Sequence, residues 1–202
     1  MGITATKVVK IAKTEDGYEE KRSNSQLNSP HANAGSNNFT KYEKDLFGSS
    51  GNYWCASFVC WVFWVACNRS KSAALKVLYS ISMSCENMRQ AFIKAKRYDN
   101  TPKVGDCVFF KGTRHAGANH IGIVIQVDRT SVTTMEGNTS SKQFDDNGGA
   151  VAKKTYPRNY SGFLGFGHPN YNRLEKKPVV KRTTVKSSTK KAETKKTPAK
   201  KK

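Results

Sequence analysis

The sequence has few of the features that mark disulfide-rich, zinc-binding or membrane-spanning proteins. Its five cysteines are an odd number at irregular spacing, and no two of them form a CxxC pair. Disulfide frameworks normally use an even set, and structural zinc sites normally use paired cysteines. The most apolar run, residues 54–67, spans 14 residues and is too short to cross a bilayer. We therefore expect no metal site and no stable membrane insertion.

The N-terminal segment also lacks the features of a signal peptide. Its first 20 residues contain neither a continuous apolar stretch nor a cleavage site. Free cysteines are usual in a reducing compartment. The sequence therefore predicts synthesis in the cytoplasm.

Acidic residues are scarce, since 15 Asp or Glu stand against 35 Lys or Arg, for a net charge of +20. The excess is densest in residues 172–202, which contain 13 Lys or Arg, 2 acidic residues and no aromatic residue. Such a segment cannot bury enough apolar surface to offset its ordering entropy. We predict a folded domain over residues 1–171 and a disordered Lys-rich tail over residues 172–202. A chain this basic should be attracted to polyanions.

Apolar residues recur at helical spacing through the first half of the domain. Residues 53–67 are apolar nearly all round, which is typical of a buried helix, although a central strand can show the same pattern. Residues 23–38 are rich in turn-forming residues and predict a long loop. The predicted helices cover residues 6–20, 39–47 and 53–67, followed by one after Ser70 and one that begins at Ser82 or Ser84 and ends near Lys96.

The second half of the domain changes to strand-like patterns bounded by turn residues. We predict strands at residues 107–110, 120–127, 131–135, 150–156 and 163–166, with a hairpin turn at residues 128–130. Helices followed by antiparallel strands predict an α+β domain, with the N-terminal helices packed on an antiparallel sheet.

Cys55 is the leading candidate for a reactive group. It follows the loop at residues 48–52 and begins the most apolar predicted helix. A thiol at a helix N-terminus meets unpaired backbone N–H groups and the positive end of the helix dipole, and both favour the nucleophilic thiolate. Taken alone, Cys55 could also be packing material, since free cysteines are commonly buried.

His120 begins a predicted strand, where a nucleophile on a neighbouring helix could reach it. An imidazole there can serve as a general base, or it can be an ordinary side chain at a strand end. Glu136 and Asn138 end the next strand of the same hairpin, and either could hold the ring of His120. Both are also common where a strand leads into a turn.

Six segments of the sequence, taken together and in order, resemble a known family. No single one of them is specific enough to show this. They are NFTKY at residues 38–42, WCASFVCWV at 54–62, PKVGDCVFF at 102–110, HIGIV at 120–124, MEGNT at 135–139 and GFGHP at 165–169. The set resembles the CHAP domain, the cysteine, histidine-dependent amidohydrolase/peptidase of bacterial and phage wall lysis. The resemblance extends over residues 5–170 and implies a papain-like fold.

The resemblance also implies roles for particular residues. The catalytic set would be Cys55 as nucleophile, His120 as base, Glu136 as the group that orients His120, and Asn138 as an accessory polar group. Trp54 and Asn119 are the candidate substrate-binding residues. Some relatives bind calcium through acidic residues just before the nucleophile, but residues 44–50 offer one carboxylate, so the sequence supports no cofactor.

The resulting functional hypothesis is a monomeric N-acetylmuramoyl-L-alanine amidase or peptidoglycan endopeptidase that serves as a phage endolysin. It would leave the host cytoplasm by a separate route, act on peptidoglycan, and contact anionic wall polymers through the tail. One alternative is a nucleic-acid-binding protein, because the tail should bind nucleic acid without sequence preference. Another is a papain-like acyltransferase, because the sequence does not separate hydrolysis from transfer.

Overall fold

The computed structural model describes residues 2–112, 116–140 and 148–171. Within these ranges the five helices come first along the chain and the six strands follow, and they form the α+β architecture predicted from the sequence. The predicted tail at residues 172–202 lies outside the described residues. The domain boundary at residue 171 therefore stays a prediction.

The helices begin where the sequence supplies capping side chains. Four of the described helices follow a Ser or Thr whose hydroxyl accepts a hydrogen bond from the backbone N–H three residues on, namely Thr4, Thr40, Ser70 and Ser84. The helices are α1 (Ala5–Thr14), α2 (Lys41–Phe47), α3 (Cys55–Ala66), α4 (Lys71–Leu78) and α5 (Cys85–Lys94). α1 ends well short of residue 20, because the chain turns at Gly17, whose φ is 84° and whose N–H donates to Val151.

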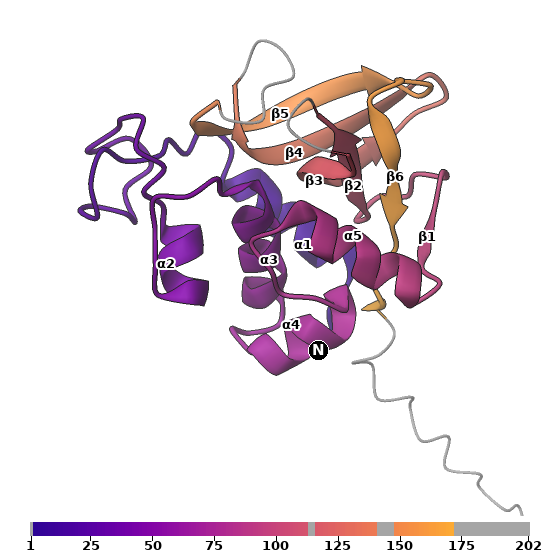
Figure 1. The fold of residues 1–202 in the computed structure, drawn as a ribbon, viewed down its shortest axis with the longest axis horizontal. Coiled ribbons are helices and arrows are strands. Elements are labelled where there is room, and N and C mark those ends of the chain that lie inside the picture. The colour runs from indigo at the N-terminus through magenta and orange to yellow at the C-terminus, as the bar shows by residue number, and fades with distance from the viewer. Residues whose placement is uncertain (1, 113–115, 141–147, 172–202) are drawn as a thin grey trace, which may run out of the picture.

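α3 is the buried helix that the apolar run predicted. Nearly all of its residues are buried, and it contacts α1, α2, α4 and the sheet. Figure 1 shows the helices gathered on one side of the sheet, with α3 among them. Across the described ranges, no helix combines the length and the apolar character that a membrane span requires.

The strands form one antiparallel sheet in the order β1-β6-β2-β3-β4-β5. Five of them match predicted strands: β2 (Cys107–Lys111), β3 (Ala118–Val127), β4 (Ser131–Thr139), β5 (Ala150–Pro157) and β6 (Phe163–Gly167). The sequence does not predict β1 (Tyr98–Asp99), because two residues are too few to show alternation. β4 is longer than predicted, so Glu136 and Asn138 lie within it rather than at its exit.

The sheet separates two apolar clusters. Along β2, Cys107 and Phe109 belong to the large cluster that includes the helices, whereas Val108 and Phe110 belong to a smaller one. Successive side chains of a strand point to opposite faces, so the helices cover one face and the smaller cluster lies on the other. His120 pairs with Phe110 across β3 and β2, and their rings are 5.5 Å apart between centroids. His120 is therefore held beside the smaller cluster.

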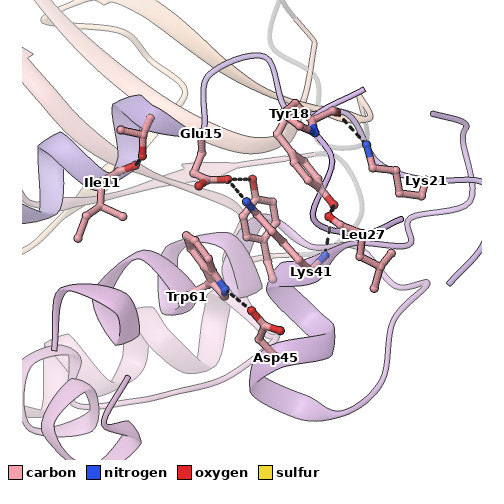
Figure 2. Close-up of polar contacts among 11 residues, drawn as sticks. Ile11, Glu15, Tyr18, Lys21, Leu27, Lys41, Asp45 and Trp61 are labelled. Carbon is pink, nitrogen blue, oxygen red and sulfur yellow. Dashed lines mark hydrogen bonds and ion pairs between the residues drawn. The ribbon is translucent and has the colours of Figure 1, made fainter. Parts of the chain in front are cut away.

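Polar contacts join the N-terminal segment to α2 and α3, as Figure 2 shows. The Glu15 carboxylate accepts hydrogen bonds from Lys41 at 2.7 Å and from the hydroxyl of Tyr42 at 2.8 Å. The indole N–H of Trp61 on α3 donates to Asp45 on α2 at 2.8 Å. These contacts hold α2 against α3 and thereby position the loop that leads into α3.

Candidate active site

Cys55 is the first residue of α3, as the sequence predicted. The preceding residue, Trp54, makes no side-chain hydrogen bond to the helix end, so no Trp54 cap satisfies the N–H groups of the first turn. The Cys55 side chain is largely buried, at 3% exposure, but it borders a pocket of about 150 Å³. The thiol therefore lies where the helix dipole favours its ionised form and where a small group can approach it.

His120 on β3 and Glu136 on β4 form a buried pair. Nε2 of His120 lies 2.9 Å from Oε2 of Glu136, and both side chains are fully buried. Glu136 also accepts hydrogen bonds from the hydroxyls of Thr134 and, at 3.0 Å, Tyr156. A carboxylate held at several points cannot turn away from the imidazole, so it keeps the His120 ring in one orientation.

The imidazole of His120 also interacts with Cys55. This interaction is a side-chain hydrogen bond, and Nε2 of the same ring faces Glu136. Burial alone would lower the pKa of His120, but hydrogen bonds with Cys55 and Glu136 raise it to about 10. Hydrogen bonds from Cys85 and His120 lower the pKa of Cys55 well below its usual range, although burial acts in the opposite direction. Both shifts lie in the direction that favours an ionised thiol beside a protonated imidazole.

Cys85 is a residue of this site that sequence reasoning missed. It is the first residue of α5, and its sulfur lies 3.4 Å from the sulfur of Cys55. The two cysteines are 30 residues apart in the sequence, and Cys85 lies in none of the motifs that led to Cys55. The one signal for Cys85 in the sequence is its position directly after Ser84, where a helix is predicted to begin.

The pocket beside the two thiols is formed by the ends of three elements. It is lined by Tyr53, Cys55, Met83, Ser84, Cys85, Ala118 and Asn119. Asn119, which the sequence analysis gave as a candidate substrate contact, is therefore at the pocket wall. Its role in binding stays a prediction.

Trp54, the other candidate substrate contact, does not reach this pocket. Its side chain is fully buried, and its indole N–H donates to the carboxylate of Glu20 at 2.9 Å. Its ring stacks on Tyr42 in the core. This burial does not fit the predicted contact with substrate, because a side chain that packs inward cannot also line the groove. The neighbouring Tyr53, 49% exposed, lines the pocket instead.

Comparison with known proteins identifies the part of the chain that contains the site. Residues 47–138 match the CHAP domain. The resemblance stated from the sequence is thus confirmed over this range, which includes Cys55, His120, Glu136 and Asn138. A CHAP domain indicates a hydrolase that acts on peptidoglycan by an amidase or peptidase type of reaction.

The other comparisons are more distant. No curated protein sequence matches the chain. One similar solved structure, titled "The crystal structure of Ly7917", shares 13% identity with a TM-score of 0.47. The similarity covers 82% of this chain and 62% of that chain, so this protein spans less than two thirds of the length of the other.

Asn138 lies in the same CHAP segment, two residues beyond Glu136 on β4. It is fully buried, and its backbone is in the left-handed region with φ 55°. Its carbonyl accepts a hydrogen bond from the N–H of Gly148 at 3.1 Å. The structure therefore places Asn138 inside the strand that carries Glu136. The accessory role inferred from the resemblance stays a prediction.

Glu86 joins α5 to β3 beside the pocket that Cys55 lines. Its carboxylate accepts the backbone N–H of Ala118 at 2.7 Å and pairs with Arg89 at 2.8 Å. The hydrogen bond from Arg89 lowers the pKa of Glu86 to about 2, so the carboxylate stays charged at neutral pH. This contact holds the helix end that carries Cys85 against the strand that carries His120.

The carboxylate considered for calcium is that of Asp45, in the loop and helix before the candidate nucleophile. One of its oxygens accepts the indole N–H of Trp61 at 2.8 Å. Among the side chains that the structure describes, no group of three or more His, Cys, Asp or Glu is placed to hold a metal ion.

Proposed function

We propose that this protein hydrolyses amide bonds in bacterial peptidoglycan with Cys55 as nucleophile and His120 as base. The proposal rests on one observation above all. Cys55 is at the N-terminus of α3, in a pocket, and hydrogen-bonded to a His120–Glu136 pair within the segment that matches the CHAP domain. This arrangement is that of a papain-like cysteine hydrolase.

The reaction follows from these contacts. The Cys55 thiolate attacks the amide carbonyl carbon, and a C–S bond forms as the carbonyl becomes an oxyanion. The imidazolium of His120 then donates a proton to the amine nitrogen as the C–N bond breaks. A water molecule, deprotonated by neutral His120, attacks the thioester and releases the carboxylate product, which restores the thiol.

Two further groups would support this chemistry. The backbone N–H of Cys55, at the start of α3, is the natural donor to the oxyanion, because the helix dipole and the unpaired N–H groups both favour negative charge there. Glu136 would stabilise the imidazolium and hold its ring, with Asn138 as an accessory polar group. Asn119 and Tyr53 line the pocket and would contact the substrate.

Mass spectrometry of the fragments released from purified walls tests the proposal. An N-acetylmuramoyl-L-alanine amidase would release stem peptides with a free N-terminal alanine, whereas an endopeptidase would release pieces cut within the stem or cross-bridge. Wall treated with the folded Cys55→Ala protein is the control and should release neither. The proposal fails if the wild-type protein releases no fragment, or if the control releases the same fragments.

Among the possible biological roles, we favour that of a bacteriophage endolysin that is made in the host cytoplasm, acts as a monomer and reaches the wall after release. The net charge of +20 supports this choice, since walls rich in phosphate polymers are anionic. Expression in a host cell, with and without a pore-forming membrane protein, tests the idea. Lysis should require the pore. Lysis without it would argue against this route.

The basic segment at residues 172–202 would add attraction to the wall. Its charge is dense, and attraction of this kind is screened over about 8 Å at physiological ionic strength. A chain that ends at residue 172 should bind intact walls less well at low salt, with a difference that shrinks as salt rises. Walls stripped of teichoic acids should mimic the deletion. If the full chain retains nucleic acid and the chain that ends at residue 172 does not, the basic segment also binds nucleic acid, as such charge predicts.

A further inference from the structure

The contact between Cys55 and Cys85 brings a second thiol into the pocket, beyond the nucleophile and base that amide hydrolysis requires. The two sulfurs are 3.4 Å apart, and both thiols line the same pocket. Neither cysteine is in a disulfide. Because each residue begins its own helix, both thiols lie at the positive end of a helix dipole, which favours the thiolate. The pocket thus brings together two thiols, each at the start of a helix.

The other three cysteines have no such environment. Cys60 and Cys107 are fully buried, and burial raises the pKa of both thiols, that of Cys60 to about 12. Cys67 ends α3, and burial raises its pKa to about 11. A thiol that stays protonated reacts slowly with oxidants. The surroundings therefore single out one pair of the five.

We propose that Cys55 and Cys85 form a reversible dithiol–disulfide site that takes hydroperoxides as its oxidising substrate. The Cys55 thiolate attacks the peroxide oxygen, which yields a sulfenic acid on Cys55 and releases hydroxide or an alkoxide. The Cys85 thiol then attacks the Cys55 sulfur, an S–S bond forms, and the oxygen leaves as water. A dithiol reductant then reduces the Cys55–Cys85 disulfide. Two electrons and two protons pass to the two sulfurs, and the reductant becomes a disulfide.

The geometry suits this second step. A disulfide needs the sulfurs about 2.05 Å apart, so the pair must close by only about 1.4 Å. Residues 79–84 before Cys85 are outside any helix or strand, and rotation of the Cys85 side chain at the end of α5 can supply the movement. The hydrogen bond from the N–H of Ala118 to Glu86 holds the start of α5 against β3 while the side chain turns.

The disulfide would have two consequences. It removes the thiolate that attacks the amide, so the proposed hydrolase would be inactive under oxidising conditions and regain activity on reduction. It also protects Cys55 from further oxidation to sulfinic acid, which reductants do not reverse. This biological role rests on the proposed function, whereas the formation of the disulfide does not.

Peptide mapping of the full chain after limited exposure to hydrogen peroxide tests the inference without any substrate. Free thiols are blocked with N-ethylmaleimide, and the unreduced digest is read by mass spectrometry. The expected product is a Cys55–Cys85 linked peptide, with the loss of two of the five free thiols. A chain that shows sulfinic acid at Cys55 and no link, or a link to Cys60 or Cys67, would overturn the proposal.

Matched variants give a second readout. Cys85→Ser removes the resolving thiol but keeps a hydrogen-bond donor, and Cys67→Ser is the control because Cys67 and Cys85 are equally exposed, at 7%. After peroxide exposure long enough to convert an unprotected sulfenic acid to sulfinic acid, and then dithiothreitol, Cys55 should regain its thiol to within about twofold in wild type and Cys67→Ser, but stay at least about tenfold depleted in Cys85→Ser. Equal recovery in all three would contradict the proposal.

These outcomes separate the two proposals. A linked peptide in a protein that releases nothing from walls would leave the disulfide site standing and refute the hydrolase. Wall hydrolysis in a protein that forms no link would do the reverse. The map of the unmutated chain decides the question even if Cys85→Ser does not fold.

Discussion

The two ends of α3 place the same residue type in surroundings that shift its pKa in opposite directions. Cys55 at the N-terminal end and Cys67 at the C-terminal end are both largely buried, at 3% and 7% exposure. Hydrogen bonds from Cys85 and His120 lower the pKa of Cys55, whereas burial raises the pKa of Cys67 to about 11. Burial alone therefore does not decide whether a thiol is reactive. The reactivity of each thiol depends on which helix end it occupies and on the side chains that hydrogen-bond to it.

Exchanging each cysteine for alanine should produce the largest contrast between the two ends. Cys55→Ala should reduce wall hydrolysis by at least about 10⁴-fold, because it removes the thiolate that is hydrogen-bonded to His120. Cys67→Ala should keep turnover and lose about 1–3 kcal/mol of stability through poorer packing. Turbidity clearing and urea unfolding measure the two effects. Undiminished clearing by a folded Cys55→Ala protein would identify another nucleophile.

Removing the imidazole should be nearly as damaging as removing Cys55. His120→Ala takes away the proton acceptor and the charge that keeps the Cys55 thiol ionised. Because the two act as a unit, the Cys55/His120 double variant should be little slower than either single variant. Rates measured on soluble wall fragments check this. If the fold-loss in rate of the double variant equals the product of the two single fold-losses, the residues work independently.

Alkylation across a pH series compares the two thiols directly. Between pH 6 and pH 8, iodoacetamide should modify Cys55 at a rate that depends less on pH than the rate at Cys67, because the pKa of Cys55 is lowered. The rate at Cys67 should rise about tenfold per pH unit over the same range, since its pKa is about 11. At pH 7 we expect Cys55 to react at least about 100-fold faster, allowing for the weaker nucleophilicity of a low-pKa thiolate. Peptide mass spectrometry gives both rates. If the two rates depend on pH in the same way, the predicted difference between Cys55 and Cys67 is wrong.

The hydrogen bonds behind His120 should have smaller effects. Glu136→Gln keeps a hydrogen-bond acceptor for the ring but loses the charge that stabilises imidazolium, so turnover should fall by about 10–100-fold. Tyr156→Phe removes one donor to Glu136 and should lower turnover by about tenfold or less. Tyr160→Phe is the matched control, because the Tyr160 ring packs against Tyr156 but none of the described hydrogen bonds joins it to Glu136. A larger loss in the control would rule out the proposed role of Tyr156.

The sequence predicted much of the fold because its signals were local. Ser70, Ser84 and Gly48 mark helix ends through contacts with residues a few positions away, and the structure shows each helix boundary at those residues. The overextended first helix and the missed strand β1 are failures of the same kind. Gly17 turns the chain through a contact with distant Val151, and two residues are too few to form a pattern.

The candidate site was predicted in part for a related reason. Cys55, His120 and Glu136 lie in segments whose order resembles a family, and the structure brings these three together. Their catalytic roles stay predictions. Tyr53 lines the pocket whereas its neighbour Trp54 is buried in the core, and the sequence pattern does not distinguish the surroundings of these two side chains.

The sequence by itself determined the elements, the basic charge and the residues able to provide a thiolate and a base, because these follow from composition and short-range spacing. The tertiary structure alone decided which groups surround them. Cys85 reaches Cys55 across 30 residues of sequence, and Tyr156 reaches Glu136 across 20. Such contacts depend on how α5 and β5 pack against the rest of the domain. Contacts between residues so far apart in the sequence produce no periodic pattern from which they could be predicted.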